Sequence, residues 1–163
     1  METKSQVNLK EAFAGESQAN RKYAAYAKKA ESEGKLNAAK LFKAASAAEA
    51  LHAEKHLAAA GKLRSTADNL ADALAGENYE FQSMYPAFIK DAEEEGNRAA
   101  AATFSLALKA EQVHAKLYKE AIENIDGIEE IFYYLCPVCG NIETSVPDKC
   151  FICGVPGSKF IKF

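Results

Sequence analysis

Acidic and imidazole side chains recur in this chain of 163 residues at spacings that are typical of metal ligands. Glu49 and His52 are three residues apart, and Glu111 and His114 repeat that spacing. Side chains three residues apart share one face of an α-helix. A Glu-x-x-His pair on each of two helices, with a single Glu on each of two others, is a known ligand pattern for two-metal carboxylate bundles. The spacing therefore predicts a centre that binds two metal ions.

The ligand pattern is part of an internal repeat. Ala-Gly-Glu ending at Glu16 recurs ending at Glu77, 61 residues later, whereas the two Glu-x-x-His pairs are 62 residues apart. The second half therefore carries one extra residue, between Glu77 and Glu93. A single insertion in a helix is commonly absorbed as a π-bulge, and such bulges cluster at functional sites. Pro86 lies in the same stretch, where we expect it to add a kink.

Glu80 has no counterpart in the first half, where the matching residue is Ala19. It lies one turn after Glu77 and is expected to face the same way. Five carboxylates and two imidazoles would carry about five negative charges, and their burial without cations would be costly. A single Glu-x-x-His pair is common on helix surfaces, but two copies within a repeat favour metal binding. His56, one turn after His52, is interpreted as a packing residue or as support for a ligand.

Tyr23 and Tyr85 lie close to the faces of Glu16 and Glu77, two turns further along. Core packing is the usual role of a tyrosine in a helix bundle. The alternative is a hydroxyl bonded to a ligand carboxylate.

The C-terminal region contains two Cys-x-x-Cys-Gly segments separated by ten residues. The cysteines are Cys136, Cys139, Cys150 and Cys153. In a cytosolic protein this pattern indicates one tetrahedral four-cysteine metal site and not a pair of disulfides. The pattern leaves open a structural zinc ion or one redox-active iron.

Strong helix formers and glycine breaks define the elements that position these residues. Helices are predicted over about residues 8–33, 37–60, 67–95 and 98–124. Thr66 and Asn97 are the predicted N-caps of the last two helices. Long helices with short connections predict an all-α four-helix bundle over residues 1–127. Residues 132–163, which contain every cysteine, are predicted to form a small β domain.

Composition excludes several classes of protein. The net charge is −3, hydrophobic residues make up 48% and charged residues 26%, which is typical of a globular protein and not of a disordered one. No basic stripe suggests nucleic-acid binding. No apolar run approaches the roughly 18 residues that a membrane-spanning helix needs. The first residues lack a signal-peptide pattern, so we expect a cytoplasmic protein.

Over nearly its whole length the chain resembles rubrerythrins, in which a ferritin-like di-iron bundle precedes a rubredoxin-like domain. The motifs occur in the same order. They are residues 12–19, both Glu-x-x-His pairs, Ala75-Gly76-Glu77 with Glu80, Met84-Tyr85-Pro86 and both cysteine segments. The short gap between the cysteine segments is a departure, and it puts the potential and the docking surface of the tail in doubt.

The resemblance implies two iron ions in the bundle and one in the tail. The implied di-iron ligands are Glu16, Glu49, His52, Glu77, Glu80, Glu111 and His114, with Glu49 and Glu111 bridging. On reduction one iron would exchange Glu80 for His52. Tyr23 and Tyr85 would hydrogen-bond to the ligand shell, and the four cysteines would hold one iron as an electron relay.

The implied activity is reduction of hydrogen peroxide to water as an oxidative-stress defence. Electrons would come ultimately from NAD(P)H, through rubredoxin or an NAD(P)H-dependent reductase. We expect a homodimer, with exchange of helices between subunits left open. One alternative is a ferritin-like ferroxidase or iron-handling protein, and another is a non-enzymatic module with zinc in the tail.

Overall fold

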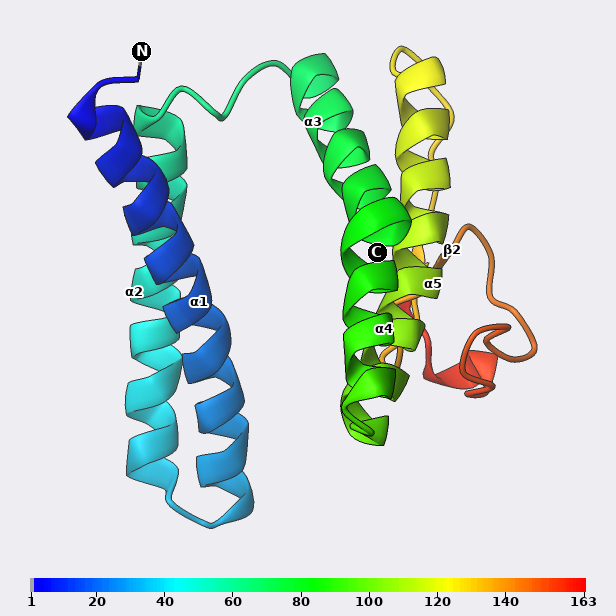
Figure 1. Cartoon of the computed structure of the whole chain (residues 1–163), viewed down its shortest axis with the longest axis horizontal. Coiled ribbons are helices and arrows are strands. Elements are labelled where there is room, and N and C mark those ends of the chain that lie inside the picture. The colour runs from blue at the N-terminus through cyan, green and yellow to red at the C-terminus, as the bar shows by residue number, and fades with distance from the viewer. Residues whose placement is uncertain (1) are drawn as a thin grey trace. The chain divides into compact units, whose positions relative to one another are not determined.

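The computed structural model describes residues 2–163 (Figure 1). Its contacts divide the chain into two compact units, one ending at Arg64 and the other running from Ser65 to Phe163. None of the described helices is long and apolar enough to cross a membrane.

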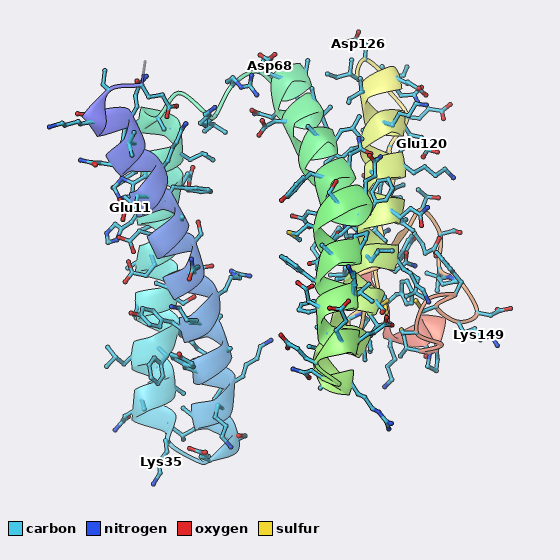
Figure 2. The ribbon with its side chains drawn as sticks, in the orientation of Figure 1. Glu11, Lys35, Asp68, Glu120, Asp126 and Lys149 are labelled. Atoms are coloured by element: carbon cyan, nitrogen blue, oxygen red, sulfur yellow. The ribbon has the colours of Figure 1, made fainter. Side chains whose placement is uncertain are left out.

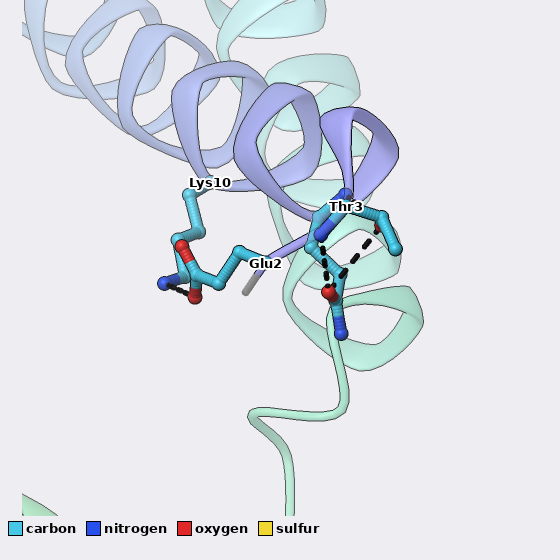
Figure 3. A network of polar contacts seen from close by, with 4 residues as sticks. Glu2, Thr3 and Lys10 are labelled. Carbon is cyan, nitrogen blue, oxygen red and sulfur yellow. Dashed lines mark hydrogen bonds and ion pairs between the residues drawn. The ribbon is translucent and has the colours of Figure 1, made fainter.

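The first unit is a hairpin of two antiparallel helices, α1 (Lys4–Ser32) and α2 (Leu36–Ala59). A capping box starts α1, because the Thr3 side chain accepts from the Gln6 backbone N–H while the Gln6 side chain accepts from Thr3. Figure 3 shows this cap and the neighbouring ion pair of Lys10 with Glu2. Gly34, with φ of 70°, ends α1 in the left-handed conformation that glycine adopts without strain.

Small residues allow α1 and α2 to approach closely, since Ala27, Ala30, Ala39 and Ala53 are all buried. A polar clamp fixes the register of the two helices. The Asn20 amide donates to the Ser46 carbonyl at 2.7 Å, and the Ser46 hydroxyl donates to the Asn20 carbonyl at 2.9 Å. The clamp lies about one helical turn from Glu16 and Glu49, so it holds those residues at the same level.

The second unit contains another helical hairpin. Its elements are α3 (Thr66–Tyr79), the π-helix η1 (Glu80–Met84), α4 (Tyr85–Glu94) and α5 (Arg98–Glu123). The π-helix lies in the stretch where the repeat predicted an extra residue, so that prediction is confirmed. Asn97 caps α5 as predicted, accepting from the Ala100 N–H at 3.1 Å. The predicted cap at Thr66 is wrong by one residue, because the Ser65 hydroxyl accepts from the Asp68 N–H and Thr66 is already helical.

The C-terminal segment of the second unit is a small β structure with two cysteine loops. Its strands pair antiparallel in the order β2–β1–β3, and they are β1 (Tyr134–Leu135), β2 (Ile142–Glu143) and β3 (Ile161–Lys162). A short 3₁₀-helix, η2 (Gly157–Lys159), precedes β3. A Cβ atom at Gly157 would lie 1.6 Å from the Pro147 carbonyl oxygen, so the chain requires glycine there.

The charged side chains that Figure 2 labels extend from the surface of each unit. Glu11 and Lys35 are exposed on the first unit, and Glu120 and Lys149 on the second. The predicted all-α ferritin-like bundle with a small cysteine-bearing β region agrees with this architecture.

Candidate metal centres

The first candidate ligand group lies at mid-height in the α1–α2 hairpin. Glu16, Glu49 and His52 each place one ligand atom within 4.8 Å of the others. His52 Nδ1 lies 2.9 Å from a Glu49 carboxylate oxygen and 3.9 Å from one of Glu16. The His52 side chain is 53% exposed, so this group opens to one side of the hairpin.

The second group is the repeat of the first, on α3 and α5. Glu77, Glu111 and His114 again converge within 4.8 Å. His114 Nδ1 lies 2.7 Å from Glu111 and 3.8 Å from Glu77. The His114 and Glu111 side chains are each 17% exposed, so the second group is the more buried one.

The tail contacts this second group directly. The opposite ring nitrogen of His114, Nε2, lies 2.9 Å from the carbonyl oxygen of Gly140, the residue after Cys139. With Nδ1 turned toward the carboxylates, an N–H at Nε2 donates to that carbonyl. A second bond of this kind fixes the ring orientation and tautomer of a ligating histidine.

The protonation of the second group follows from burial and crowding of charge. Burial, followed by a hydrogen bond and charge repulsion from Glu111, raises the pKa of Glu77 to about 7. The hydrogen bond from His114 lowers the pKa of Glu111. Burial opposes the charged form of His114, but its bonds to Glu111 and to the Gly140 carbonyl outweigh burial and raise its pKa. Glu77, Glu111 and His114 therefore share protons in the metal-free protein. Binding of a cation would release these protons, because metal ligands must be deprotonated.

Glu80 stands at the start of η1, outside the three converging atoms of the second group. Burial, followed by the charge of Glu111, raises the pKa of Glu80. Burial, followed by the charges of Glu111, Glu80 and Glu77, raises the pKa of Tyr85 as well. Both groups therefore hold their protons more firmly than they would in water.

Tyr23 and Tyr85 each belong to a cluster of three aromatic rings, one in each helical hairpin. Tyr23 packs with Tyr26 and Phe42 at centroid distances of 6.2 Å. The second cluster joins Tyr85 with Phe88 at 6.3 Å and with Phe104 at 6.2 Å. Each ring of one cluster corresponds to a ring of the other at an offset of 62 residues, a signal that identifies both sets in the sequence. Packing is thus established for both tyrosines, and a hydroxyl bond to a ligand stays a prediction.

His56, in the last turn of α2, is not a member of any candidate ligand group formed by residues 2–163. It is partly buried, which agrees with its interpretation as a packing residue.

The four cysteines converge as predicted. The sulfur atoms lie within 4.8 Å of one another, with Cys136 to Cys153 at 3.5 Å and Cys139 to Cys150 at 3.6 Å. All four are free thiols, and Cys136 and Cys150 are only 1% exposed. The two loops share one backbone pattern, with positive φ at Gly140 and Gly154.

The environment favours a thiolate at one position of the cysteine cluster, Cys150, whereas burial raises the pKa of Cys139. Burial raises the pKa of Cys150, but backbone N–H groups of Cys153 and Ile152 outweigh it and bring the pKa down to about 7. Four converging sulfurs with inward N–H donors fit a tetrahedral zinc or iron ion. The two Glu-Glu-His groups likewise supply the oxygen and nitrogen donors of carboxylate-bridged iron.

Two repeated Glu-Glu-His hairpins and a four-cysteine tail define a ferritin-like protein with candidate di-iron and rubredoxin-like sites. Comparison with known proteins agrees, since a family model described as Rubrerythrin matches residues 7–122. The chain belongs to the rubrerythrin family.

Similar proteins match almost the whole chain. Nigerythrin of Nitratidesulfovibrio vulgaris is 40% identical, with 96% of this chain and 85% of the relative covered. Rubrerythrin-2 of Clostridium acetobutylicum is 34% identical, with coverages of 95% and 94%. A solved structure of mixed-valence nigerythrin has a TM-score of 0.61 at 38% identity and covers 100% of this chain and 88% of its own. Nigerythrin has also been solved in a fully reduced, all-ferrous state, with a TM-score of 0.61 at 37% identity.

Sequence reasoning missed two features of these sites. The Asn20–Ser46 clamp carries no recognisable motif. The bond from His114 to Gly140 joins residues 26 positions apart, in segments that were interpreted separately.

Proposed function

We propose that this protein is a non-haem di-iron peroxidase that reduces hydrogen peroxide to water. The observation that carries the proposal is the presence, in one chain, of two Glu-Glu-His groups and a four-cysteine cluster. A storage protein has no need of the cysteine cluster, whereas a reductase needs a route for electrons. The mixed-valence and all-ferrous states of nigerythrin support redox-active iron in a close relative.

In this proposal residues 1–127 form the di-iron bundle and residues 132–163 form the iron-tetrathiolate domain. The di-iron ligands are Glu16, Glu49, His52, Glu77, Glu80, Glu111 and His114. Cys136, Cys139, Cys150 and Cys153 hold the third iron.

Bound iron would supply Lewis acidity and paired electrons at the bundle, and single-electron transfer at the tail. The chain's own groups supply protons and orientation. Burial and the nearby charge of Glu111 raise the pKa of Glu80, which favours its acid form and suits it to give a proton to a leaving oxygen. Tyr85 stays a neutral phenol that can donate a hydrogen bond. By resemblance, Glu80 and His52 would be alternative ligands of one iron, and Tyr23 would act in the first hairpin as Tyr85 does in the second.

The proposed partners are hydrogen peroxide and an electron donor such as rubredoxin or an NAD(P)H-dependent reductase. The free thiols of the cysteine cluster suit a reducing compartment, which supports a cytoplasmic location.

The short connection between α2 and α3 supports a homodimer with exchanged helices. Ferritin-like bundles contain a crossover that runs along the bundle between their two hairpins. Here residues 60–65 are the whole connection. Six residues span at most about 21 Å, whereas α2, with 24 residues, is about 36 Å long.

Hydrogen bonds at both ends prevent this connection from lengthening easily. Lys62 N–H donates to the Leu57 carbonyl at 3.1 Å and Gly61 N–H to that of Ala58 at 2.9 Å, which closes α2. Ser65 caps α3. A ferritin-like bundle is therefore reached most directly by pairing the α1–α2 hairpin of one copy with the α3–α5 hairpin of a second.

Complementation tests this assembly. One chain carries Glu49→Ala with His52→Ala, and the other carries Glu111→Ala with His114→Ala. Co-refolding with ferrous iron should give mixed dimers in which one of the two centres is intact, so the purified mixed dimers should show half of the di-iron absorbance of wild type, and the unseparated equimolar mixture about a quarter. Mixed dimers with no restored di-iron absorbance would exclude exchange. Because iron loading is the readout, this result is independent of peroxidase activity.

The activity test is anaerobic. The iron-loaded protein is fully reduced and mixed with a small excess of hydrogen peroxide, enough to remove all three electrons held by each chain, with air-saturated buffer in parallel. Return of the red ferric-tetrathiolate absorbance that is rapid with peroxide and much slower with air would support the peroxidase. Loaded iron that ignores peroxide and consumes dioxygen would replace it with a ferroxidase or iron-handling function.

A further inference from the structure

Asn141 is a polar side chain sealed inside the cysteine-bearing tail. It is 0% exposed and is, with Cys136 and Cys150, among the largest fully buried side chains of the described residues. A buried amide is stable only where its hydrogen bonds are made. Its partners therefore show what it does there.

Each N–H bond of the Asn141 amide has an anionic or sulfur acceptor. Nδ2 lies 2.8 Å from a Glu143 carboxylate oxygen and 3.9 Å from the sulfur of Cys150. Oδ1 has no hydrogen-bond partner within residues 2–163. Turning the amide over would aim this acceptor at a carboxylate and a thiolate, so the network fixes Nδ2 as the group that faces the sulfur.

The backbone of Asn141 also contacts the cluster. Its carbonyl accepts from the Cys136 N–H at 2.8 Å, and its N–H bonds to the Cys139 sulfur. The second cysteine loop repeats the carbonyl bond, with Cys150 N–H donating to Val155 at 2.8 Å. Val155 occupies in the second loop the position that Asn141 occupies in the first. Because Val155 is apolar, a loop of this kind does not need a side-chain amide at that position to fold. The side chain of Asn141 is therefore an addition to the loop.

We propose that Asn141 is a positioning residue that raises the reduction potential of the iron held by the four cysteines. A hydrogen bond to a ligand sulfur stabilises the oxidation state in which the sulfurs carry more negative charge. For a tetrathiolate iron this is the ferrous state, with one more negative charge than the ferric state. This inference rests on the proposal that iron occupies the cluster. It concerns a property of the tail that can be measured without peroxide.

The test is a spectroscopic titration of the iron-loaded full chain, followed by the red ferric absorbance. Asn141→Val copies the second loop and removes the donor, and Asn141→Asp keeps the shape of the side chain while removing the donor. Both should bind iron and titrate at a lower potential. At fixed solution potential the ferric-to-ferrous ratio should rise about tenfold, which is about 59 mV for one electron.

Glu143→Gln is the matched control, because it leaves the Asn141 donor in place and removes a nearby negative charge. It should keep the potential or raise it. Variants of Asn141 that titrate at the wild-type potential would overturn the proposal, as would a Glu143→Gln variant that falls as far as they do.

If neither Asn141 variant retained iron, the wild type itself would decide the question. Cadmium-113 substitution should give a scalar coupling between the metal and an Asn141 side-chain proton, carried through Cys150. Cadmium-loaded protein without that coupling would overturn the proposal. The peroxidase proposal survives any of these results, because its test measures reoxidation by peroxide.

Discussion

His114 Nε2 lies 2.9 Å from the carbonyl oxygen of Gly140, so one imidazole joins a candidate di-iron ligand group to the loop that carries Cys139. The same ring turns Nδ1 toward Glu111 and Glu77. Helix α5 and the tail are consequently tied together within the second unit, because a candidate ligand, His114, and a backbone carbonyl of the cysteine loop are in hydrogen-bond contact. This gives a short covalent and hydrogen-bonded route between the two kinds of centre.

Removing that ring should loosen the tail. In His114→Ala the Gly140 carbonyl loses its donor, and the resistance of the tetrathiolate site to denaturant should fall by about 1 kcal/mol. The measurement is the guanidinium midpoint at which the iron-loaded protein loses its red absorbance. His52→Ala removes the equivalent ligand of the first unit and is the control. Equal midpoints in both variants would show that the contact contributes nothing to the tail.

Glu80 should matter for turnover and not for folding. Glu80→Ala or Glu80→Gln removes a carboxyl group whose pKa is raised by burial and by the charge of Glu111, so reoxidation by peroxide should slow by about 10²-fold, the lower range for a lost general acid. Stopped-flow absorbance of prereduced protein measures this rate, and circular dichroism checks the helices. A wild-type rate in both variants would remove Glu80 from the mechanism.

Cys136→Ala separates single from multiple turnover. The bundle, once reduced chemically, should still react with one equivalent of peroxide, because its ligands are untouched. Sustained turnover from a reduced rubredoxin-type donor should be lost, because the relay is missing. Sustained turnover at the wild-type rate would contradict the relay role.

The raised pKa values of Glu77 and His114 predict how the free energy of unfolding of the metal-free protein depends on pH. Glu77 has a pKa of about 7 in the fold and 4.5 as a free group, so it binds more protons folded than unfolded between those values. Its contribution to stability is therefore complete below pH 4.5 and is lost as pH rises to about 7. His114, whose pKa is also raised, extends the loss above its ordinary value of 6.5.

Urea denaturation of the metal-free protein should thus give a free energy of unfolding that declines from pH 4.5 to above 7. Glu77→Gln should flatten the lower part of that decline. Zinc-loaded protein is the control and should show the opposite slope, since binding requires deprotonated ligands. A metal-free protein that becomes more stable over this range would disprove the assignment of the retained protons.

Much of this architecture is predictable from sequence because the repeat includes acidic, histidine and aromatic residues at matching positions. The 62-residue offset relates His52 to His114 and Tyr23 to Tyr85, and its one-residue irregularity predicted the π-helix. The cap at Ser65 was missed by one position because Ser65 and Thr66 are both good N-caps, and only backbone geometry decides between them. Asn141 carried no signal, since its meaning depends on a sulfur nine residues away that only the folded loop brings near.

The π-helix itself provides the last prediction. Deleting Gln82, an exposed residue of η1, restores the spacing of the first hairpin and allows regular α-helical bonds through residues 80–84. Because π-bulges are generally retained at functional sites at some cost in regular helix bonding, the metal-free deletion variant should be at least as stable as wild type.

The aromatic cluster of Tyr85 fixes the C-terminal part of this helix against α5, so the deletion should rotate Glu77 and Glu80 relative to Glu111. Iron loading or peroxide reoxidation should therefore fall about tenfold or more, given the sensitivity of catalysis to small displacements. Thermal unfolding, iron content and stopped-flow rates measure these effects, with deletion of an exposed residue from the connection before Ser65 as the control for shortening the chain. A variant with wild-type iron content and wild-type rate would show that the extra residue has no role in placing the carboxylates.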